Sequence, residues 1–296
     1  MMGTVKSSLR VGRQAVLAGR AVTVLTGVIV GHVGHGAMLK QDMPRIAMRL
    51  GSRYEHLIMR TINFLSMREW IYKNPALASR VEWLSDKVMS VTNGEVLNLE
   101  EAQEMVASII DSGYTVATGT CPCRRARNQI SDEMPNNTDM VFGRWADTYL
   151  ETCPALYHSL DPAEARDLLD EFDRFGFIHQ AYGFGGKRGA AYVLCNCDKD
   201  ICIPLLAQKR RGFQAFRKGR SRAVIDAAAC QGVEECGACI ERCPFDARSA
   251  SSSGKASVDA EGCFGCGVCV VTCKGHATRL ERKKGAQLVY ARDFVS

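Results

Sequence analysis

The sequence lacks the motifs that mark the common nucleotide-dependent and hydrolytic enzymes. Its glycine-rich segment from Gly183 to Gly189 falls between two predicted strands, whereas a dinucleotide-binding turn joins a strand to a helix. No phosphate-binding loop is present, and the six scattered histidines do not define a Ser-His-Asp set. Motifs that read a nucleic-acid groove are also missing, so nucleic acid is not an expected partner. The chemistry of this chain must therefore come from another residue type.

Acidic residues are nearly missing from two stretches of this chain, whose net charge is +6. Residues 1–60 contain nine Lys or Arg but only two acids, and Lys209 to Arg222 contains seven basic residues and no acid. Basic patches attract acidic proteins or a membrane surface. We expect a redox partner protein to dock on the second stretch, and a membrane surface to be a second partner for the basic N-terminus. The expected docking residues are Lys209, Arg210, Arg211 and Arg217.

Long uninterrupted hydrophobic runs are also missing. The most apolar segment, Ala21 to Met38, contains glycines as well as His32 and His35, so it is a poor membrane span. It does not resemble a signal peptide with a small-residue cleavage site. We expect this segment to be buried or interfacial. At 296 residues, with 46% hydrophobic and 24% charged residues, the chain has the composition of an ordinary soluble protein with room for two domains.

Cysteine, by contrast, is abundant: the chain has 14, and eight of them fall in its last quarter. Their runs are Cys-x5-Cys-x2-Cys-x3-Cys from Cys230 and Cys-x2-Cys-x2-Cys-x3-Cys from Cys263. Bacterial two-cluster ferredoxins use such runs, and the fourth cysteine of each run ligates the cluster of the other run. Such thiols need a reducing compartment, so we expect the cytoplasm, with attachment to a membrane within a complex as a variant. The expected [4Fe–4S] ligands are Cys230, Cys236, Cys239 and Cys273 for one cluster and Cys263, Cys266, Cys269 and Cys243 for the other.

An internal repeat supports two related halves. Asp226 lies four residues before Cys230, and Asp259 lies four residues before Cys263. The halves differ, because the first gap is five residues long in one run and two in the other, so the type of the first cluster stays open. A pair of zinc sites is the alternative for these eight cysteines.

Six further cysteines lie in three groups in the middle of the chain. Two of these groups contain Cys-x-Cys pairs that follow a predicted strand or turn, so both sulfurs of a pair can face one centre. Arg124 and Arg125 favour the thiolate forms of the first pair. Structural zinc and ordinary buried cysteines are the alternatives to a third iron–sulfur cluster. The expected ligands of that cluster are Cys121, Cys123, Cys195 and Cys197, with Cys153 and Cys202 in reserve.

Local patterns place these groups on helices and strands. Residues 39–97 have helical periodicity, Asn98 is expected to cap a helix, and Asp161 to cap another. The second helix and a hairpin formed by residues 177–182 and 190–195 together resemble a winged-helix unit. The expected fold class is α+β. Its expected parts are a basic helical N-terminal region (1–97), a cysteine-containing middle domain with the winged-helix-like unit (98–207), a basic linker (208–223) and a ferredoxin-like two-cluster domain (224–296).

The order CPCR, ETC, CNC and two-cluster ferredoxin resembles a family of anaerobic iron–sulfur binding proteins over residues 115–285. The family has a longer cysteine-rich segment after CNC, where this chain has DKDICIP. The resemblance implies electron transfer, often beside a larger oxidoreductase. We expect an electron-transfer protein or subunit that relays single electrons between a low-potential donor and a partner oxidoreductase, with no catalytic residues of its own. The alternatives are an oxidoreductase with an open-site cluster in the middle domain and a redox-sensing iron–sulfur module.

Overall fold

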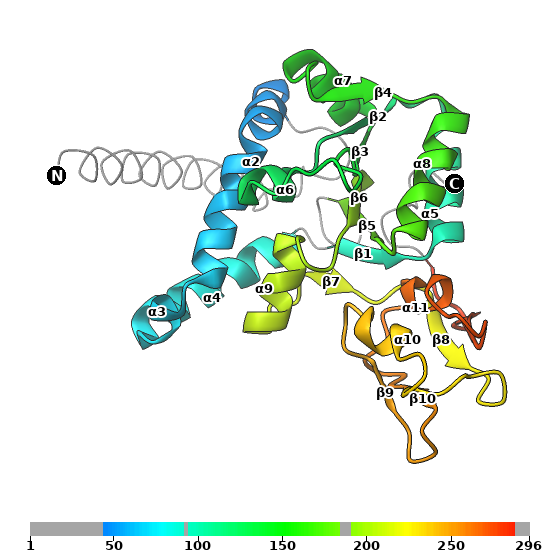
Figure 1. Ribbon diagram of the computed structural model, residues 1–296. Coiled ribbons are helices and arrows are strands. Elements are labelled where there is room, and N and C mark those ends of the chain that lie inside the picture. Colours follow the sequence, from blue (N-terminus) through cyan, green and yellow to red (C-terminus); the bar gives the residue numbers. More distant parts are fainter. Residues whose placement is uncertain (1–43, 92–93, 184–190, 288–296) are drawn as a thin grey trace.

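The computed structural model describes residues 44–91, 94–183 and 191–287 (Figure 1). Over these residues the chain is mixed α/β, compatible with the expected α+β class, and has a seven-stranded sheet and two two-stranded sheets. The helices are α2 (Arg45–Met67), α3 (Glu69–Tyr72), α4 (Pro75–Val91), α5 (Leu99–Asp111), α6 (Pro122–Arg127), α7 (Gly143–Thr152), α8 (Pro162–Arg174), α9 (Ile203–Arg211), α10 (Ala238–Glu241) and α11 (Val268–Val271). The strands are β1 (Gly94–Leu97), β2 (Val116–Gly119), β3 (Asp139–Phe142), β4 (Tyr157–Ser159), β5 (Ile178–Gly183), β6 (Ala191–Cys197), β7 (Phe216–Arg217), β8 (Ser221–Ile225), β9 (Arg248–Ala250), β10 (Ala256–Val258) and β11 (Thr278–Arg282).

The large sheet has helices on both faces (Figure 1). Its order is β4-β2-β3-β6-β5-β1-β7, and all neighbours are antiparallel except the short β1–β7 pair. Helices α5 and α8 cover one face, where Leu97, Met105 and Leu169 belong to the main hydrophobic core. Helix α7 and the start of α2 cover the other face, where Met48 and Trp145 belong to a second core cluster.

The second face of the sheet carries the polar and cysteine side chains of the middle domain. Asp139 on β3 lies opposite Cys195 on β6, and Cys195 lies opposite Gln180 on β5. Directly opposed residues of antiparallel strands point to the same face. A row of Asp139, Cys195 and Gln180 therefore crosses this face, and it places the middle cysteines between the sheet and the helices α2, α6 and α9.

Local capping explains where α5 and α8 begin, as the sequence predicted. The Asn98 side chain accepts a hydrogen bond from the Glu101 N–H at 2.9 Å, and the Glu101 carboxylate accepts one from the Asn98 N–H at 3.2 Å. Asp161 and Glu164 form the same reciprocal cap at α8. Caps of this kind contribute about 1 kcal/mol each. The predicted capping residues are therefore confirmed.

The C-terminal part repeats one order of elements. Strand β8, α10 and β9 form the first copy, and β10, α11 and β11 form the second. The outer strands β8 and β11 pair antiparallel, and so do the inner strands β9 and β10. In Figure 1 this part lies beside the edge of the large sheet that carries β7. The duplicated order agrees with the repeat seen in the sequence.

Several expectations meet a different structure or fall outside the described residues. The expected basic linker, 208–223, holds the end of α9, all of β7 and the start of β8, and β7 extends the large sheet. The serine-rich stretch around Ser252 turns tightly between β9 and β10. The segment Ala21 to Met38 and the hairpin loop 184–190 lie outside the described residues. Within the described ranges no helix has the length and apolar character needed to cross a bilayer.

Candidate metal centres

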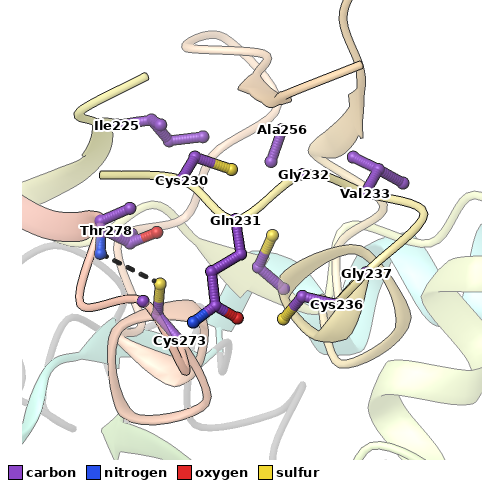
Figure 2. A pocket seen from close by; sticks show the side chains of 13 residues that line it. Ile225, Cys230, Gln231, Gly232, Val233, Cys236, Gly237, Ala256, Cys273 and Thr278 are labelled. Carbon is purple, nitrogen blue, oxygen red and sulfur yellow. Dashed lines mark hydrogen bonds between the residues drawn. The ribbon is translucent and has the colours of Figure 1, made fainter. Parts of the chain in front are cut away.

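A first cavity in the C-terminal part is lined by four cysteines drawn from both runs. Cys230, Cys236 and Cys239 come from the first run, and Cys273 is the last cysteine of the second. About 380 Å³ between the lining residues is free of atoms, including space open to solvent. Figure 2 shows Cys230, Cys236 and Cys273 around the side chain of Gln231, which belongs to the five-residue gap of the first run. The cavity unites the four cysteines that the sequence predicted as one ligand set.

A second cavity gathers the other four. Cys263, Cys266 and Cys269 line it together with Cys243 from the first run, and about 340 Å³ between the lining residues is free of atoms, solvent-open space included. The three cysteines that the second run contributes to this cavity are only 8–9% exposed, whereas all four cysteines of the first cavity are half-buried. The two cavities thus differ in burial, and each takes one cysteine from the opposite run.

Matching backbone features shape the two cavities. Gly237 and Gly267 precede α10 and α11 with φ of 60° and 86°, the left-handed region that favours glycine. They let the loop turn sharply between its second and third cysteines. The Ala247 N–H donates to the Cys243 Sγ at 3.3 Å, and the Ala277 N–H donates to the Cys273 Sγ at 3.2 Å. The sulfurs exchanged between the halves therefore receive equivalent hydrogen bonds.

Buried Arg248 offers a test of whether these cavities fit an anionic cluster. The residue is 6% exposed, and its Nη2 donates to the Thr278 Oγ1 at 2.7 Å. Its Nε and Nη1 are buried without a hydrogen-bond partner. Its charge acts on Cys239 of the first cavity and on Cys269 of the second, so it lies between the two. A buried cation with unpaired N–H groups is costly unless a negative group faces it. Thiolates carrying an anionic iron–sulfur cluster would supply that charge, so the residues fit such a group.

Burial and hydrogen bonding act in opposite directions on these thiols. Burial raises the pKa of Cys266 well above its usual value and that of Cys269 to about 12. Backbone N–H groups of Ala256 and Gly232 lower the pKa of Cys230. Cys266 and Cys269 of the second cavity are therefore thiolates only when a positive charge compensates them, whereas the more open first cavity favours the thiolate of Cys230 through its own backbone.

The spacing of side chains bears on the choice between one ion and a cluster. Among residues 44–91, 94–183 and 191–287, no three His, Cys, Asp or Glu side chains are arranged to hold a single metal ion. A zinc site needs ligands that converge tetrahedrally on one point. A cubane binds each thiolate at a different iron, so its ligands lie farther apart. In each of the two cavities, four cysteines line one shared space.

In the middle domain, five of the six cysteines form one connected group. Neighbouring thiols lie close enough to shift each other's pKa: Cys121 and Cys123, Cys123 and Cys202, Cys202 and Cys197, and Cys197 and Cys195. Cys121 and Cys202 immediately precede the helices α6 and α9, while Cys195 and Cys197 lie on β6. All four expected ligands are thus brought together, and Cys202 stands in the centre of the group. The sequence signal for Cys202 was weak, because it lies five residues beyond the Cys-x-Cys pair.

Cys153 stands apart from this connected group. It follows α7, and its thiol donates to the Ser52 carbonyl oxygen at 3.7 Å. The neighbouring hydroxyl of Thr152 donates to its sulfur at 3.7 Å. Cys153 therefore ties α7 to α2, a structural contact.

The middle thiols have unequal acidity. Hydrogen bonds from Cys123 and Cys197 lower the pKa of Cys202 to about 6. Hydrogen bonding to Cys123, followed by burial, raises the pKa of Cys121 well above its usual value. The buried guanidinium of Arg124, beside this group in the sequence, forms an ion pair with Asp198 at 3.4 Å. Cys202 is therefore the group's most readily ionised member among those whose pKa is shifted.

Two carboxylates border the middle cysteines, buried Asp139 and half-buried Glu55, and no sequence motif pointed to them. The Cys195 thiol donates to the Asp139 Oδ1 at 3.3 Å, and the Tyr157 hydroxyl donates to its Oδ2 at 2.6 Å. Tyr149 donates to the carboxylate of Glu55 on α2. Burial raises the pKa of Asp139 to about 6, and burial followed by the charge of Asp139 raises that of Glu55 to about 8. An acidic, proton-holding patch therefore lies against one side of the cysteine group.

The basic stretch 209–222 is largely occupied by contacts within the chain. Lys209 pairs with Asp246 at 3.0 Å, and Arg211 pairs with Glu69 at 2.7 Å. Arg220 lies 3.2 Å from the buried carboxylate of Glu101 at the start of α5. Further pairs join Lys218 to Glu261 and Arg222 to Glu281. These residues connect the helices, the large sheet and the C-terminal part, a role that the sequence did not suggest.

Comparison with known proteins adds no assignment: no model of a known protein family matches the chain, and no curated protein matches it.

Proposed function

We propose that this chain is an iron–sulfur electron-transfer protein or subunit that relays single electrons between a low-potential donor and a partner oxidoreductase. One observation carries the proposal: eight cysteines line two cavities, and each cavity takes three from one run and one from the other. When bound, a [4Fe–4S] cluster accepts and returns one electron at a time. The chain's own residues hold the thiolates, supply the N–H groups of Ala247 and Ala277, and offset negative charge through Arg248.

The finer fold assignments belong to the same proposal. Residues 224–296 are proposed to be a ferredoxin-like two-cluster domain, supported by the duplicated β–α–β order and the antiparallel pairing of β8 with β11. Helix α8 with the hairpin of β5 and β6 is proposed to be a winged-helix-like unit, here serving to aim Cys195 and Cys197. Membership of the anaerobic iron–sulfur binding proteins rests on the cysteine order of the sequence.

A third iron–sulfur centre is proposed in the middle domain. Four of its five connected cysteines are the residues expected from the sequence, and the group is buried: Cys123, Cys197 and Cys202 are 7%, 7% and 3% exposed. Cys202 lies at the N-terminus of α9, where the positive end of the helix dipole faces the group. Thiolates held there would be stabilised without a surface cation.

One contact favours the second candidate, an oxidoreductase with an open-site cluster. Asp139 offers an oxygen beside Cys195, and a carboxylate is a weaker ligand of iron than a thiolate. The burial of this site favours electron exchange over substrate turnover, so electron transfer remains the conclusion. Replacing Asp139 with Asn separates the two candidates: a change in the middle-centre spectrum would favour a ligand role for the carboxylate.

Partner docking on Lys209, Arg210, Arg211 and Arg217 remains part of the proposal, although Lys209 and Arg211 already bind acids of the chain. Exposed Arg210 is the residue to test first. Charge reversal, Arg210→Glu, should slow electron transfer to an acidic partner at low salt and have less effect at high salt, because screening acts over about 10 Å at 0.1 M. Equal rates at both salt concentrations would exclude this docking surface.

The test of the central proposal is metal and sulfide analysis of the full chain purified without oxygen. Two cubanes in the C-terminal part predict roughly eight irons and as many acid-labile sulfides, reversibly reducible in one-electron steps, with further iron from the middle domain. Zinc without iron or labile sulfide would overturn the proposal.

A further inference from the structure

The middle cysteines and the second cavity belong to one continuous hydrophobic cluster. Cys197 and Cys202 of the middle domain share this cluster with Cys266 of the second cavity. Phe216 on β7 and Val268 on α11 are members too, so side chains from both parts of the molecule fill the space between the cysteines. No cysteine of the first cavity is part of the cluster. The second cavity is therefore the one that adjoins the middle domain.

Four aromatic rings follow one another through this region. Tyr182 packs against the cluster next to the middle cysteines, and its ring centroid lies 6.4 Å from that of Phe216. Phe216 lies 6.1 Å from Phe245, which stacks on Phe264 at 4.0 Å and an interplanar angle of 12°. Phe264 directly follows Cys263, and both Phe245 and Phe264 line the second cavity. The series of rings thus ends beside the proposed ligands of the second centre.

Glycines at the junction permit this close packing. A Cβ on Gly94 would come within 2.9 Å of the Tyr182 ring and 3.0 Å of Phe216. A Cβ on Gly219 would come within 2.3 Å of the Val96 carbonyl oxygen, and the Gly219 N–H donates to the Phe264 carbonyl oxygen at 2.9 Å. The backbone thus fixes the loop of the second cavity against the large sheet.

We propose that the middle cysteine group, with Cys202 as a ligand, is the buried end of a three-centre electron path, joined to the second ferredoxin centre through Tyr182, Phe216, Phe245 and Phe264. This rests on the proposed function. A low-potential one-electron donor delivers an electron at the half-buried first cavity. With all three centres loaded, this electron would pass from the first centre to the second and then from the second to the middle centre, each transfer oxidising one centre and reducing the next by one electron. Electron tunnelling weakens steeply with distance and with gaps in packing, so the filled junction favours this order.

The first experiment measures iron content and the EPR spectrum of the dithionite-reduced full chain. We expect Cys202→Ser to remove the iron of the middle centre, whereas Cys153→Ser, the matched control, keeps it. Two nearby unpaired spins split or broaden each other's lines, so Cys202→Ser should also sharpen the signal of the second centre. The signal of the first centre is identified as the one that Cys239→Ser removes. In Cys202→Ser this signal should stay unchanged.

Failure of this inference is distinguishable from failure of the proposed function. A chain with both ferredoxin signals and no further iron, or with a middle-centre spin that interacts only with the first centre, overturns the inference alone. A chain without iron at any site overturns the proposed function.

The second experiment tests the rings. After flash photoreduction, the arrival of the electron at the middle centre should slow in Phe216→Leu and in Phe245→Leu. Phe175→Leu is the control, because Phe175 packs on Phe177 at the α8 end, outside the series of rings. Unchanged rates in both test variants, with all three centres loaded, would rule out the aromatic path.

Discussion

At the residue scale, Arg248 is a buried cation whose unpaired N–H groups need a negative charge from the groups bound in the two cavities. Its buried Nε and Nη1 have no partner, while its charge reaches Cys239 and Cys269 on opposite sides. Nothing in the sequence marked it, since Arg248 is one of many basic residues in a basic chain. A charged residue in this position changes the reduction potential of a metal centre without being one of its ligands.

Replacing Arg248 with Met should lower the reduction potentials of both ferredoxin centres, because a positive charge stabilises the more negative, reduced state. A shift of about 60 mV would equal a tenfold change in the equilibrium constant of a one-electron couple. Redox titration followed by EPR measures it. Arg279→Met removes an exposed arginine of the same part and should leave the potentials in place. If both variants titrate like the parent chain, Arg248 has no influence on the centres.

Glu55 gives a prediction about pH. Its pKa is raised from 4.5 to about 8 by burial and then by the charge of Asp139, so the folded chain keeps a proton that the unfolded chain loses between these pH values. Stability should therefore fall as pH rises through this window, by at most about 1.4 kcal/mol per pH unit. In Glu55→Gln this loss should disappear from denaturant unfolding curves. Exposed Glu82→Gln is the control, and parallel pH profiles for Glu55→Gln and the parent would contradict the assignment.

At the scale of elements, the sequence predicted features that depend on neighbouring residues, such as helix caps, and missed strands that depend on pairing between distant residues. Asn98 and Asp161 were identified as helix caps because capping depends on neighbours within one turn. Strand β1 (Gly94–Leu97) lies within the range 39–97 that was expected to be helical, and β3 and β4 were not predicted, because such short strands acquire their place from the sheet. Cross-strand pairing between β9 and β10 likewise makes the serine-rich stretch around Ser252 a hairpin. Pairing partners far apart in the chain leave no local pattern.

The ion pair of Arg220 and Glu101 should be the strongest polar link between the C-terminal part and α5. Their side chains are 12% and 4% exposed, so Arg220→Met removes the cation that faces a buried carboxylate. The carboxylate keeps its hydrogen bonds from the Asn98 N–H and the Ser221 hydroxyl, and the loss of the ion pair should cost about 3 kcal/mol of unfolding free energy. Arg222→Met breaks a pair whose side chains are 50% and 41% exposed and should cost less than about 1 kcal/mol. Chemical denaturation measures both. Equal losses of unfolding free energy in the two variants would show that the burial of an ion pair does not affect its contribution to stability.

At the scale of the whole molecule, the repeat of cysteine runs was readable because one motif occurs twice. It predicted both four-cysteine sets, and the structure brings each set to one cavity. The central place of Cys202 and the aromatic junction were not readable, because they depend on how α9, β7 and the C-terminal part pack together. A stretch expected to be a linker became the element that joins the parts.

The interlocked ligand sets are the central claim, and a pair of substitutions within one run tests them most directly. Cys239 and Cys243 belong to the same run but line different cavities. In anaerobically prepared full chain, EPR of Cys239→Ser and Cys243→Ser should each show one disturbed cluster signal, and the disturbed signals should differ. Cys243→Ser should match Cys266→Ser, while Cys239→Ser should match Cys273→Ser. If Cys239→Ser and Cys243→Ser disturb the same signal, each run binds its own cluster and the account is wrong.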